Sequence, residues 1–433
     1  MTTVQGSSLL KLAATHRLRR AVLAAVLILA GATLARAELP SDPAVAPPVS
    51  AGGVLLPVAS DARVVGDGER TRFVLDLSGP VEISAFTLGD PYRVVVDLPE
   101  VTFRLPDDAG LTGRGLVTGW RYGLFARGRS RLVIDATGPV TIDGAFVLKG
   151  AEGAAARLVV DLVRSTPEDF QSALQKTALT REASNTVGVT KGDRLRADSG
   201  RERPLIMLDP GHGGVDAGTI ASSGIKEKDV VLAFAEDLKR RLEATGKVDV
   251  SMTRTDDTFI PLGDRVRIAR EAAADLFVSI HADSVREDHV RGATVYTLSE
   301  RASDRAAAAL ADKENAADAV AGLELEPAEA GEVSDILIDL TRRETQTFSA
   351  SFANTLVGEL SNTTRMIRNP HRSAGFWVLR APDVPSVLLE IGYLSNEEDE
   401  QLLTNNDWRG KVADAVSAAM LRFLQPKIAA AGQ

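Results

Sequence analysis

Short runs of alternating apolar and polar residues fill the first half of the chain from about residue 58. Four of them, rich in Val, Leu and Ile and bounded by Gly, Pro or Asp, lie at residues 72–77, 92–98, 131–135 and 157–162. Such runs are typical of β-strands. The segment 71–81, which ends in SGPV, recurs at 130–140, which ends in TGPV. Because the repeat indicates a duplicated β meander, we expect residues 58–165 to form two related sheets packed as a sandwich.

The pattern changes after residue 204 to strands that alternate with helices. A buried-strand run at 205–208 precedes a glycine-rich turn, and apolar residues at helical spacing over 230–242 predict an amphipathic helix. Further β-rich runs lie at 248–252, 276–280, 294–298 and 387–391. We therefore expect an α/β domain with a mixed sheet over residues 204–425, followed by a tail at 426–433.

Three segments interrupt these patterns. Residues 38–57 are rich in Pro, Ala and Val, and residues 166–203 are polar and charged, so both predict linkers. Within the α/β region, an Ala-rich helical stretch at 302–321 is followed by an acidic run and then by a long helix from about 334 to 360. An α/β layer does not need this addition, and we expect a helical insert at residues 300–346.

The amino terminus has the pattern of an export signal at residues 1–37. Arg17, Arg19 and Arg20 precede an apolar run, and Ala35-Arg36-Ala37 resembles a cleavage site. An uncleaved membrane anchor is the alternative, but the uncharged apolar run is shorter than the roughly 20 residues that span a bilayer. We expect an exported protein with no stable membrane span after cleavage, by the general or the twin-arginine route.

Composition and charge narrow the chemistry. The expected signal holds five basic and no acidic side chains, so its removal changes the formal net charge from −9 to −14. This acidity argues against a nucleic-acid partner. Cysteine is absent, which excludes disulfides, thiolate metal ligands and a cysteine nucleophile. Histidine and carboxylate groups remain as ligands for a metal ion.

Two histidines follow predicted strands in similar settings. His212 lies in DPGHGG after the first strand of the α/β region, and His281 ends another strand in FVSIHAD. Ligands of open α/β sheets collect at the carboxyl ends of strands. Two histidines and a carboxylate form a common catalytic zinc shell, and Glu227 stands immediately before the amphipathic helix. Glu390, at the end of an apolar strand, is a candidate general base. The alternative is two structural histidines and an ordinary helix N-terminal glutamate.

Four stretches that hold these residues occur in a characteristic order: DPGHGG, KEKDVVLAFAEDL, ADLFVSIHAD and PSVLLEIGYLSN. Over about residues 204–425 the chain resembles the N-acetylmuramoyl-L-alanine amidase family of cell-wall hydrolases. The resemblance implies one zinc ion bound by His212, Glu227 and His281, and Glu390 as the catalytic acid/base. A small departure is Arg270, where many relatives carry Asn.

The resemblance extends to the other segments. Residues 58–165 resemble the AMIN targeting domain, which binds cell-wall material. The insert resembles the regulatory helix of division-associated members, which covers the active site until a partner removes it. In this resemblance Glu314 of the KEN sequence would occupy zinc, although a charged residue on a helix is ordinarily part of a solvated face. The implied role is peptidoglycan hydrolysis in the periplasm during wall remodelling and daughter-cell separation, controlled by an activator protein.

Two other functions remain open at this point. A zinc carboxypeptidase or endopeptidase acting within the stem peptide would use an arginine for a terminal carboxylate, and Arg254, Arg265 or Arg372 could serve. A non-catalytic wall-binding scaffold would have a damaged site, whereas all four positions are filled here. His371 is expected in a loop, either as part of the loop structure or as a contact to substrate.

Overall fold

The computed structural model describes residues 56–89, 91–106, 108–126, 128–150, 155–172, 174, 201–285, 287–323 and 336–431, of which 336–340 and 431 are described by their backbone alone. The expected export signal lies outside the described residues, as do nearly all of the first linker, most of the second linker and the acidic run of the insert. Within the described ranges, no helix combines the length and apolar character needed to cross a membrane.

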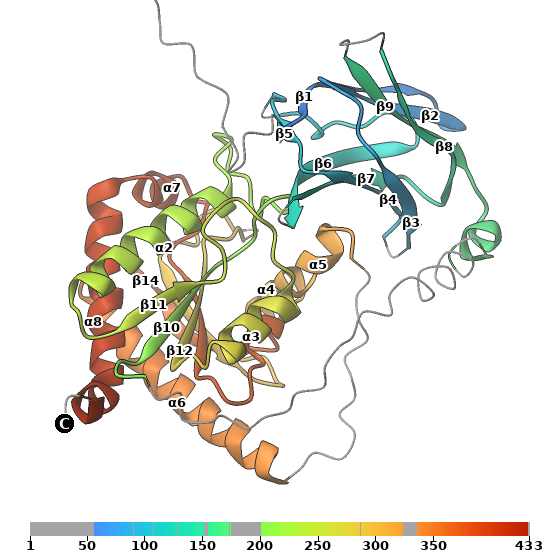
Figure 1. The fold of residues 1–433 in the computed structure, drawn as a ribbon. Helices are drawn as coiled ribbons and strands as arrows, with labels where there is room; N and C mark the ends of the chain where they lie inside the picture. Colours follow the sequence, from blue (N-terminus) through green and yellow to red (C-terminus); the bar gives the residue numbers. More distant parts are fainter. Residues whose placement is uncertain are drawn as a thin grey trace, which may run out of the picture. The chain divides into compact units, whose positions relative to one another are not determined.

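Residues 58–164 form nine β-strands in two sheets (Figure 1). The strands are β1 (Val58–Gly66), β2 (Arg70–Leu77), β3 (Ser84–Leu88), β4 (Arg93–Pro99), β5 (Thr102–Phe103), β6 (Val117–Ala126), β7 (Arg129–Ala136), β8 (Val140–Leu148) and β9 (Ala156–Arg164). One sheet has the order β5-β1-β2-β9-β8 and the other β3-β4-β7-β6. Apolar side chains from both sheets, including Phe73, Val96, Leu132 and Val160, form one buried cluster. This is the sandwich that the alternating pattern predicts.

The sequence duplication explains how the two sheets are assembled. The first copy contributes its β1–β2 hairpin to one sheet and its β3–β4 hairpin to the other. The second copy contributes β8–β9 to the sheet that holds β1–β2, and β6–β7 to the sheet that holds β3–β4. β2 and β7 are the matching strands of the two copies, and each pairs antiparallel with the later strand of the other copy, β9 or β4. Each sheet therefore contains one hairpin from each copy, and neither copy makes a sheet alone.

Residues 205–431 form an α/β domain around a six-stranded mixed sheet of order β11-β10-β12-β15-β13-β14. Its strands are β10 (Leu205–Pro210), β11 (Asp249–Met252), β12 (Leu276–His281), β13 (Ala293–Leu298), β14 (Met366–Ala374) and β15 (Ser386–Glu390). Its helices are α2 (Glu227–Ala244), α3 (Leu262–Glu271), α4 (Arg305–Asn315), α5 (Ala317–Val320), α6 (Ile336–Ser361), α7 (Glu397–Leu403), α8 (Asn406–Ala431) and the 3-10 turn η1 (Trp377–Leu379).

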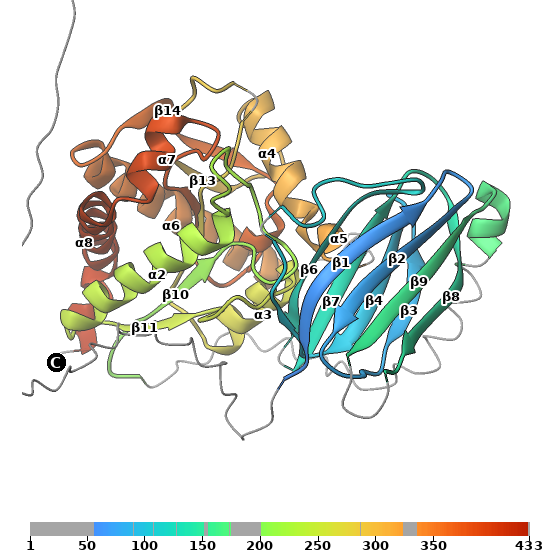
Figure 2. The same ribbon diagram turned by 90° about the horizontal axis from the view of Figure 1, so that it is seen from above.

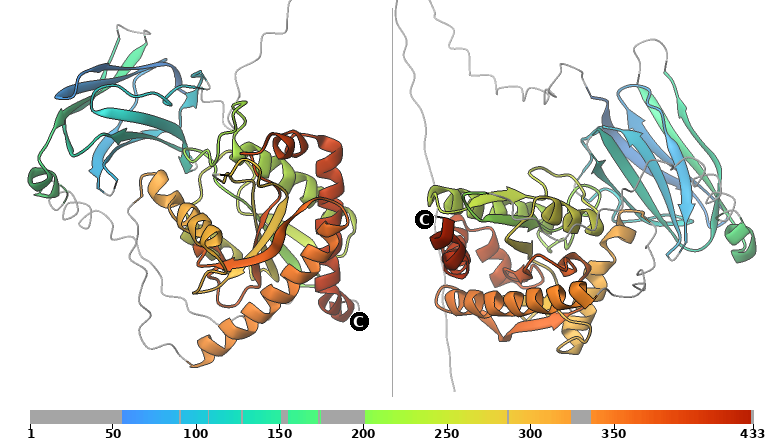
Figure 3. Two further views of the ribbon diagram at one scale, coloured as in Figure 1. Left: turned by 180° about the vertical axis from the view of Figure 1, so that it is seen from behind. Right: turned by 60° about the horizontal axis from the view of Figure 1, so that its bottom comes forward.

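Helices cover both faces of this sheet (Figures 1 and 2). Because successive strand residues point to opposite faces, Ile206 and Leu208 of β10 pack with α2, α6 and α8, whereas Leu205 and Met207 pack with α3 and α4. α6 packs against α8, and Figure 3 shows α6 (orange) crossing beside α8 (red). The predicted fold class, an all-β sandwich and an α/β domain with a mixed sheet, is confirmed.

Some details of the expected elements were wrong. The loop expected around His371 is part of β14, an edge strand parallel to β13. Its sequence is polar and contains Pro370, which an edge strand tolerates because one side of its backbone has no strand partner. The helical stretch expected at 302–321 is divided at Ala316 into α4 and α5. By contrast, the long helix expected from about 334 to 360 is confirmed as α6, which ends at Ser361. α8 continues through Pro426 to Ala431, into the segment expected as a tail.

Candidate metal centre

Three neighbouring parallel strands bring the predicted site residues to one edge of the sheet. β12 lies between β10 and β15 and pairs parallel with both. His281 and Glu390 are register partners at the last positions of β12 and β15. His212 follows β10, whose last residue, Pro210, is paired with Ile280. The carboxyl ends of parallel strands meet at one edge, and this topology accounts for the proximity of three residues that are far apart in sequence.

Glu227 supplies a carboxylate between the two histidines. It is the first residue of α2, it is fully buried, and its Oε1 lies 3.2 Å from both His212 Nε2 and His281 Nδ1. Backbone N–H groups of Thr219 and Ala282 donate to its two oxygens at 2.9 Å. Burial opposes ionisation, but the two imidazoles outweigh it and hold the pKa of Glu227 well below its usual value. The side chain is therefore a fixed anion.

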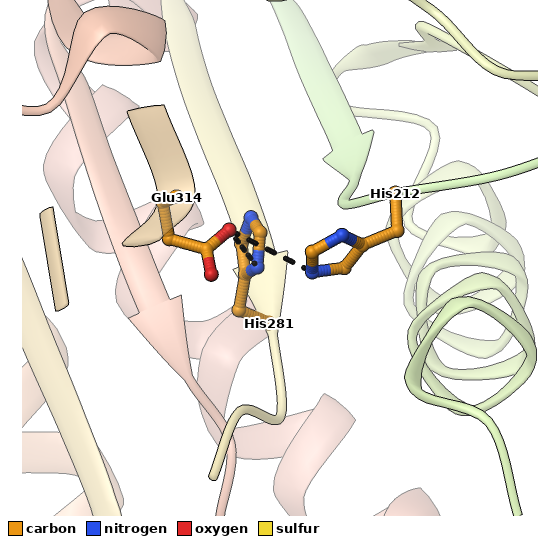
Figure 4. A group of neighbouring side chains, drawn as sticks. All are labelled: His212, His281 and Glu314. Atoms are coloured by element: carbon orange, nitrogen blue, oxygen red, sulfur yellow. Dashed lines mark ion pairs between the residues drawn. The ribbon is translucent and has the colours of Figure 1, made fainter. Parts of the chain in front are cut away.

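Glu314 reaches the same place from the insert. It stands in the last turn of α4, and its Oε2 lies 3.2 Å from His281 Nδ1 and 3.6 Å from His212 Nε2. Figure 4 shows the carboxylate pointing at the two imidazole rings. The residue is 5% exposed, so the solvated-face interpretation is wrong. Burial raises the pKa of this carboxyl to about 7, against the opposing effect of the two histidines.

The donor set fits a divalent cation. Asp216 Oδ2 lies 2.8 Å from His212 Nδ1, which fixes a proton on that nitrogen and leaves Nε2 as an electron-pair donor. Nε2 has no hydrogen-bond donor near it and faces two carboxylates instead. His212, His281 and Glu314 have ligand atoms within 4.8 Å of one another, and Glu227 Oε1 lies beside both nitrogens. Nitrogen and carboxylate oxygen are ordinary zinc donors, so a cation at this point would satisfy atoms that are otherwise left unpaired or repelling.

The backbone around His212 is shaped for this approach. His212 itself has φ +59°, a left-handed conformation that non-glycine residues rarely adopt and that is concentrated at functional sites. A β-carbon on Gly211 would lie 2.4 Å from His281 Cε1, and one on Gly218 would lie 2.6 Å from His212 Cδ2. Both positions therefore require glycine, because a β-carbon at either would overlap a histidine ring.

Two buried arginines donate hydrogen bonds to the backbone of the His212 loop. Arg254 donates to the carbonyls of Pro210 at 3.0 Å and Gly211 at 2.7 Å. Arg265 donates to the carbonyls of Pro210 at 2.8 Å and His212 at 2.7 Å. Both are at most 3% exposed. Their donors bind the backbone of the loop, which is a scaffold role rather than recognition of a peptide carboxylate.

Glu390 lies beside the centre with one oxygen free. Its Oε2 accepts from the Asp283 N–H at 3.0 Å, while Oε1 is buried with no hydrogen-bond partner among the described residues. Burial, then the charges of Asp283 and Glu227, raises the pKa of this carboxyl well above its usual value. A carboxyl that is readily protonated in this place can hold and deliver a proton.

The remaining sequence-predicted residue does not join this cluster. His371, in β14, is hydrogen-bonded through Nε2 to Thr297 Oγ1 and through Nδ1 to Asn354 Oδ1, both at 3.1 Å. Its partly buried environment lowers the pKa of the imidazole. Arg270, the departure from the family pattern, pairs with Asp383 at 2.9 Å.

Three residues of the site escaped sequence reasoning. Asp216 stands four residues after His212, Asp283 two residues after His281, and Lys313 directly before Glu314. Spacing from a proposed ligand is the signal that could have pointed to the two aspartates, since partners of metal-binding histidines are commonly carboxylates. The ion pair between Lys313 and Asp283 has no sequence signal, because it joins the insert to a distant strand end.

Fold and site together define an α/β protein with a two-histidine, two-glutamate cluster at its sheet edge, and comparison with known proteins identifies its family. The model of the N-acetylmuramoyl-L-alanine amidase family matches residues 206–422, and the AMIN domain model matches residues 61–162. The chain therefore belongs to the N-acetylmuramoyl-L-alanine amidase family and carries an AMIN domain.

Individual relatives cover most of the chain. It is 34% identical over 387 residues to N-acetylmuramoyl-L-alanine amidase AmiC of Neisseria meningitidis, with 87% of this chain and 92% of the relative aligned. AmiC of Escherichia coli is 33% identical over 376 residues, with 83% and 88% aligned. A solved structure, N-acetylmuramoyl-L-alanine amidase AmiC2 of Nostoc punctiforme, is 29% identical and aligns with 51% of this chain and 97% of its own length at a TM-score of 0.37.

Proposed function

We propose that the protein is a zinc-dependent amidase that hydrolyses the amide bond between the lactyl group of muramic acid and L-Ala of the peptidoglycan stem peptide. The observation that carries the proposal is the position of Glu227 Oε1, 3.2 Å from a nitrogen of each histidine. The ends of two strands and the start of a helix thus supply two imidazoles and a carboxylate to one point. Membership of the amidase family supports the substrate and the bond.

The chain's own groups have distinct roles in this proposal. His212, Glu227 and His281 would hold the ion, which when bound supplies Lewis-acid activation of water and of the amide carbonyl. Asp216 keeps His212 in the tautomer that presents Nε2. Glu390 accepts a proton from the attacking water and returns it to the nitrogen of the leaving peptide, a role that fits its raised pKa and its free Oε1.

The same geometry supports autoinhibition. Glu314 Oε2 lies next to both histidine nitrogens, and in this proposal it takes the place of the substrate carbonyl or water. α4 is fixed there on both sides of Glu314, by Lys313 and by Asn315, whose side chain bonds the Gly375 carbonyl at 3.0 Å and the Trp377 N–H at 2.8 Å. An activator protein that binds the insert and prefers the uncovered form would open the site.

The cellular setting follows from the family. The AMIN domain and the AmiC relatives support an exported, periplasmic enzyme that acts in wall remodelling and daughter-cell separation. In this proposal the β-sandwich binds wall material and brings the α/β domain to its substrate.

The test is a comparison of full-length parent with Glu314→Ala on purified sacculi. The parent should be nearly silent, and Glu314→Ala should release stem peptides whose amino terminus is L-Ala, identified by mass analysis of the soluble products. Asp312→Ala is the matched control, because it removes an exposed carboxylate from the same helix and should remain silent. Products cut within the stem peptide would indicate a carboxypeptidase or endopeptidase, and a zinc-loaded variant with no products at all would indicate a scaffold.

Point substitution is preferable to removal of the whole insert. α6 is one continuous helix from Ile336 to Ser361, and Thr345 in its first half is already buried. Its second half supplies Phe352, Leu356 and Leu360 to the core of the α/β domain. Excision of residues 299–347 would therefore remove part of a packed helix and confuse loss of inhibition with loss of stability.

A further inference from the structure

The side chain of Lys313 lies in a polar binding site, here called the seat, that is formed entirely by residues of the α/β core. Its Nζ forms an ion pair with Asp283 and lies 3.1 Å from Thr219 Oγ1 and 3.5 Å from Ser284 Oγ. Thr219 belongs to the loop before α2, and Asp283 and Ser284 follow β12. None of the three comes from the insert, so the seat does not depend on α4 for its shape.

The negative charge in the seat is the buried carboxylate of Asp283, and its cationic partner, Lys313, belongs to the insert. Asp283 is 0% exposed, and Lys313 is the cation that pairs with it among the residues that the structure describes. Its Oδ1 also accepts from Thr219 Oγ1 at 2.7 Å and from the Ser284 N–H at 2.6 Å, whereas Oδ2 is buried without a hydrogen-bond partner in the described ranges. An unpaired buried carboxylate is costly. If α4 withdraws, this position therefore favours another cation.

The seat lies next to Glu390, the proposed catalytic acid/base. The backbone N–H of Asp283 donates to Glu390 Oε2 at 3.0 Å, so the residue that carries the carboxylate of the seat is hydrogen-bonded through its backbone to the proposed acid/base. On the outer side Lys313 lines a cavity of about 410 Å³ together with Thr219, Ser284 and the carboxylate-bearing residues Glu397 and Glu400. The seat thus adjoins a recess that is lined by Glu397 and Glu400 and not by the two histidines.

Neighbouring residues of the insert fill two neighbouring subsites with opposite charges. Glu314 presents a carboxylate to the histidine pair, and Lys313 presents an ammonium to Asp283 beside Glu390. Hydrolysis of an amide gives the same two groups: water adds its hydroxyl to the acyl carbon and its hydrogen to the nitrogen, and the products ionise to a carboxylate and an ammonium. The inhibitory pair has the charge pattern of the two reaction products.

We propose that Asp283, Thr219 and Ser284 form a subsite for a primary ammonium group of the stem peptide, and that Lys313 occupies this subsite in the blocked enzyme. The inference rests on the proposed amidase function and names a substrate contact of the same site. Two sources share this chemistry: the amino terminus released by cleavage and a side-chain amine of the peptide. The recess toward Glu397 and Glu400 admits the rest of a peptide in either case.

The first test needs neither substrate nor turnover. In full-length Lys313→Ala the ammonium is removed and its seat is emptied, so propylammonium chloride at about 0.1 M should raise the unfolding temperature by about 2–4 °C relative to sodium chloride and tetramethylammonium chloride at equal ionic strength. The parent and Arg305→Ala, which removes an exposed cation from the same helix, should show no such difference. Equal effects of the three salts on Lys313→Ala would overturn the subsite. Because no catalysis is measured, a failed amidase assay does not affect this result.

The second test distinguishes the sources. Binding of a stem peptide to full-length Lys313→Ala/Glu314→Ala is measured by calorimetry with both amines free, with only the amino terminus acetylated, or with only the side-chain amine acetylated. A loss of tenfold or more on one acetylation supports the proposal and identifies that amine as the ligand. Unchanged affinity for both acetylated peptides, with the free peptide bound, overturns it. Asp283→Asn in the same background should lower the affinity for the peptide with both amines free. Ser284→Ala should lower this affinity less, because it leaves the buried carboxylate in place.

Discussion

Asp216 Oδ2 lies 2.8 Å from His212 Nδ1, and both side chains are buried. The second oxygen of Asp216 accepts from the Gly218 N–H at 3.1 Å, so the carboxylate is itself fixed. Burial opposes a charged His212, but the nearby carboxylates, with Glu227 and Asp216 foremost, outweigh it and raise the pKa of the imidazole well above its usual value. The pair therefore orients the ring and makes Nε2 a stronger electron-pair donor toward a metal ion.

Asp216→Ala should lower zinc affinity by about 10–100-fold, the usual cost of losing a carboxylate partner of a metal-bound histidine. Competition with a zinc chelator measures the change directly. Asp264→Ala, which removes an exposed carboxylate from α3, should leave the affinity unchanged. An Asp216→Ala protein with parental zinc affinity would show that this ion pair only packs the loop.

His281→Ala and Glu390→Gln should separate metal binding from proton transfer. His281→Ala removes a nitrogen next to Glu227 and should lose both zinc and activity. Glu390→Gln keeps the shape of the side chain and should retain zinc while losing turnover, because the amide cannot shuttle a proton. Elemental analysis of the purified variants checks the first property and sacculus hydrolysis in the Glu314→Ala background checks the second. The reverse pattern of zinc retention would exchange the two roles.

The sequence allowed prediction of which residues come together at this edge of the sheet, because strand ends and a helix start could be located from apolar periodicity. His281 and Glu390 each end such a run, and adjacent parallel strands brought them into register. Periodicity gave no sign of β14, whose polar residues and Pro370 form an edge strand. The break at Ala316 was also invisible, since Ala is the best helix former and gives no signal of a helix end.

Asn315→Ala should partly relieve the inhibition that we propose. Asn315 ties the end of α4 to Gly375 and to Trp377, the first residue of η1, by two side-chain hydrogen bonds, each contributing about 1 kcal/mol. Their loss, about 2 kcal/mol in all, should increase the open population, and with it the basal hydrolysis of sacculi, by about 30-fold. Asn362→Ala, at the carboxyl end of α6, is the control. Unchanged basal activity of a zinc-loaded Asn315→Ala enzyme would mean that other contacts hold the insert.

Asp209→Asn should destabilise the α/β domain in a pH-dependent way. Asp209 is 0% exposed and accepts from Arg265 at 2.8 Å, Thr253 at 2.6 Å and Ser279 at 2.7 Å. Burial alone would raise its pKa, but Arg265 and the two hydroxyls hold the pKa below its usual value. The substitution leaves the Arg265 charge without its carboxylate, at a cost of about 3–5 kcal/mol near neutral pH.

The sign of the pH effect follows from that lowered pKa. A carboxyl with a lower pKa in the folded state stabilises the protein fully above its unfolded pKa of about 3.9, and the stabilisation is lost as pH falls through the folded value. The difference in unfolding free energy between parent and Asp209→Asn should therefore be constant near neutral pH and should shrink below about pH 4. Urea unfolding at a series of pH values measures it, and a difference that grows on acidification would contradict the assignment.

The β-sandwich, residues 58–165, should fold as an isolated fragment and bind insoluble peptidoglycan. Each of its sheets contains one hairpin from each copy of the repeat, so the two copies close a common core, and Phe73, Leu132 and Val160 at its centre are 0% exposed. A core closed within one segment can be stable alone. The fragment should unfold cooperatively, and Leu132→Ala should lower its free energy of unfolding by about 2–5 kcal/mol because it leaves a cavity between the sheets.

Sedimentation of the folded fragment with purified sacculi then tests the targeting role, with Leu132→Ala above its unfolding temperature as the control for nonspecific adsorption. A cooperatively folded fragment that stays in the supernatant, together with unchanged localisation of the protein lacking residues 58–165, would assign wall targeting to another part of the chain.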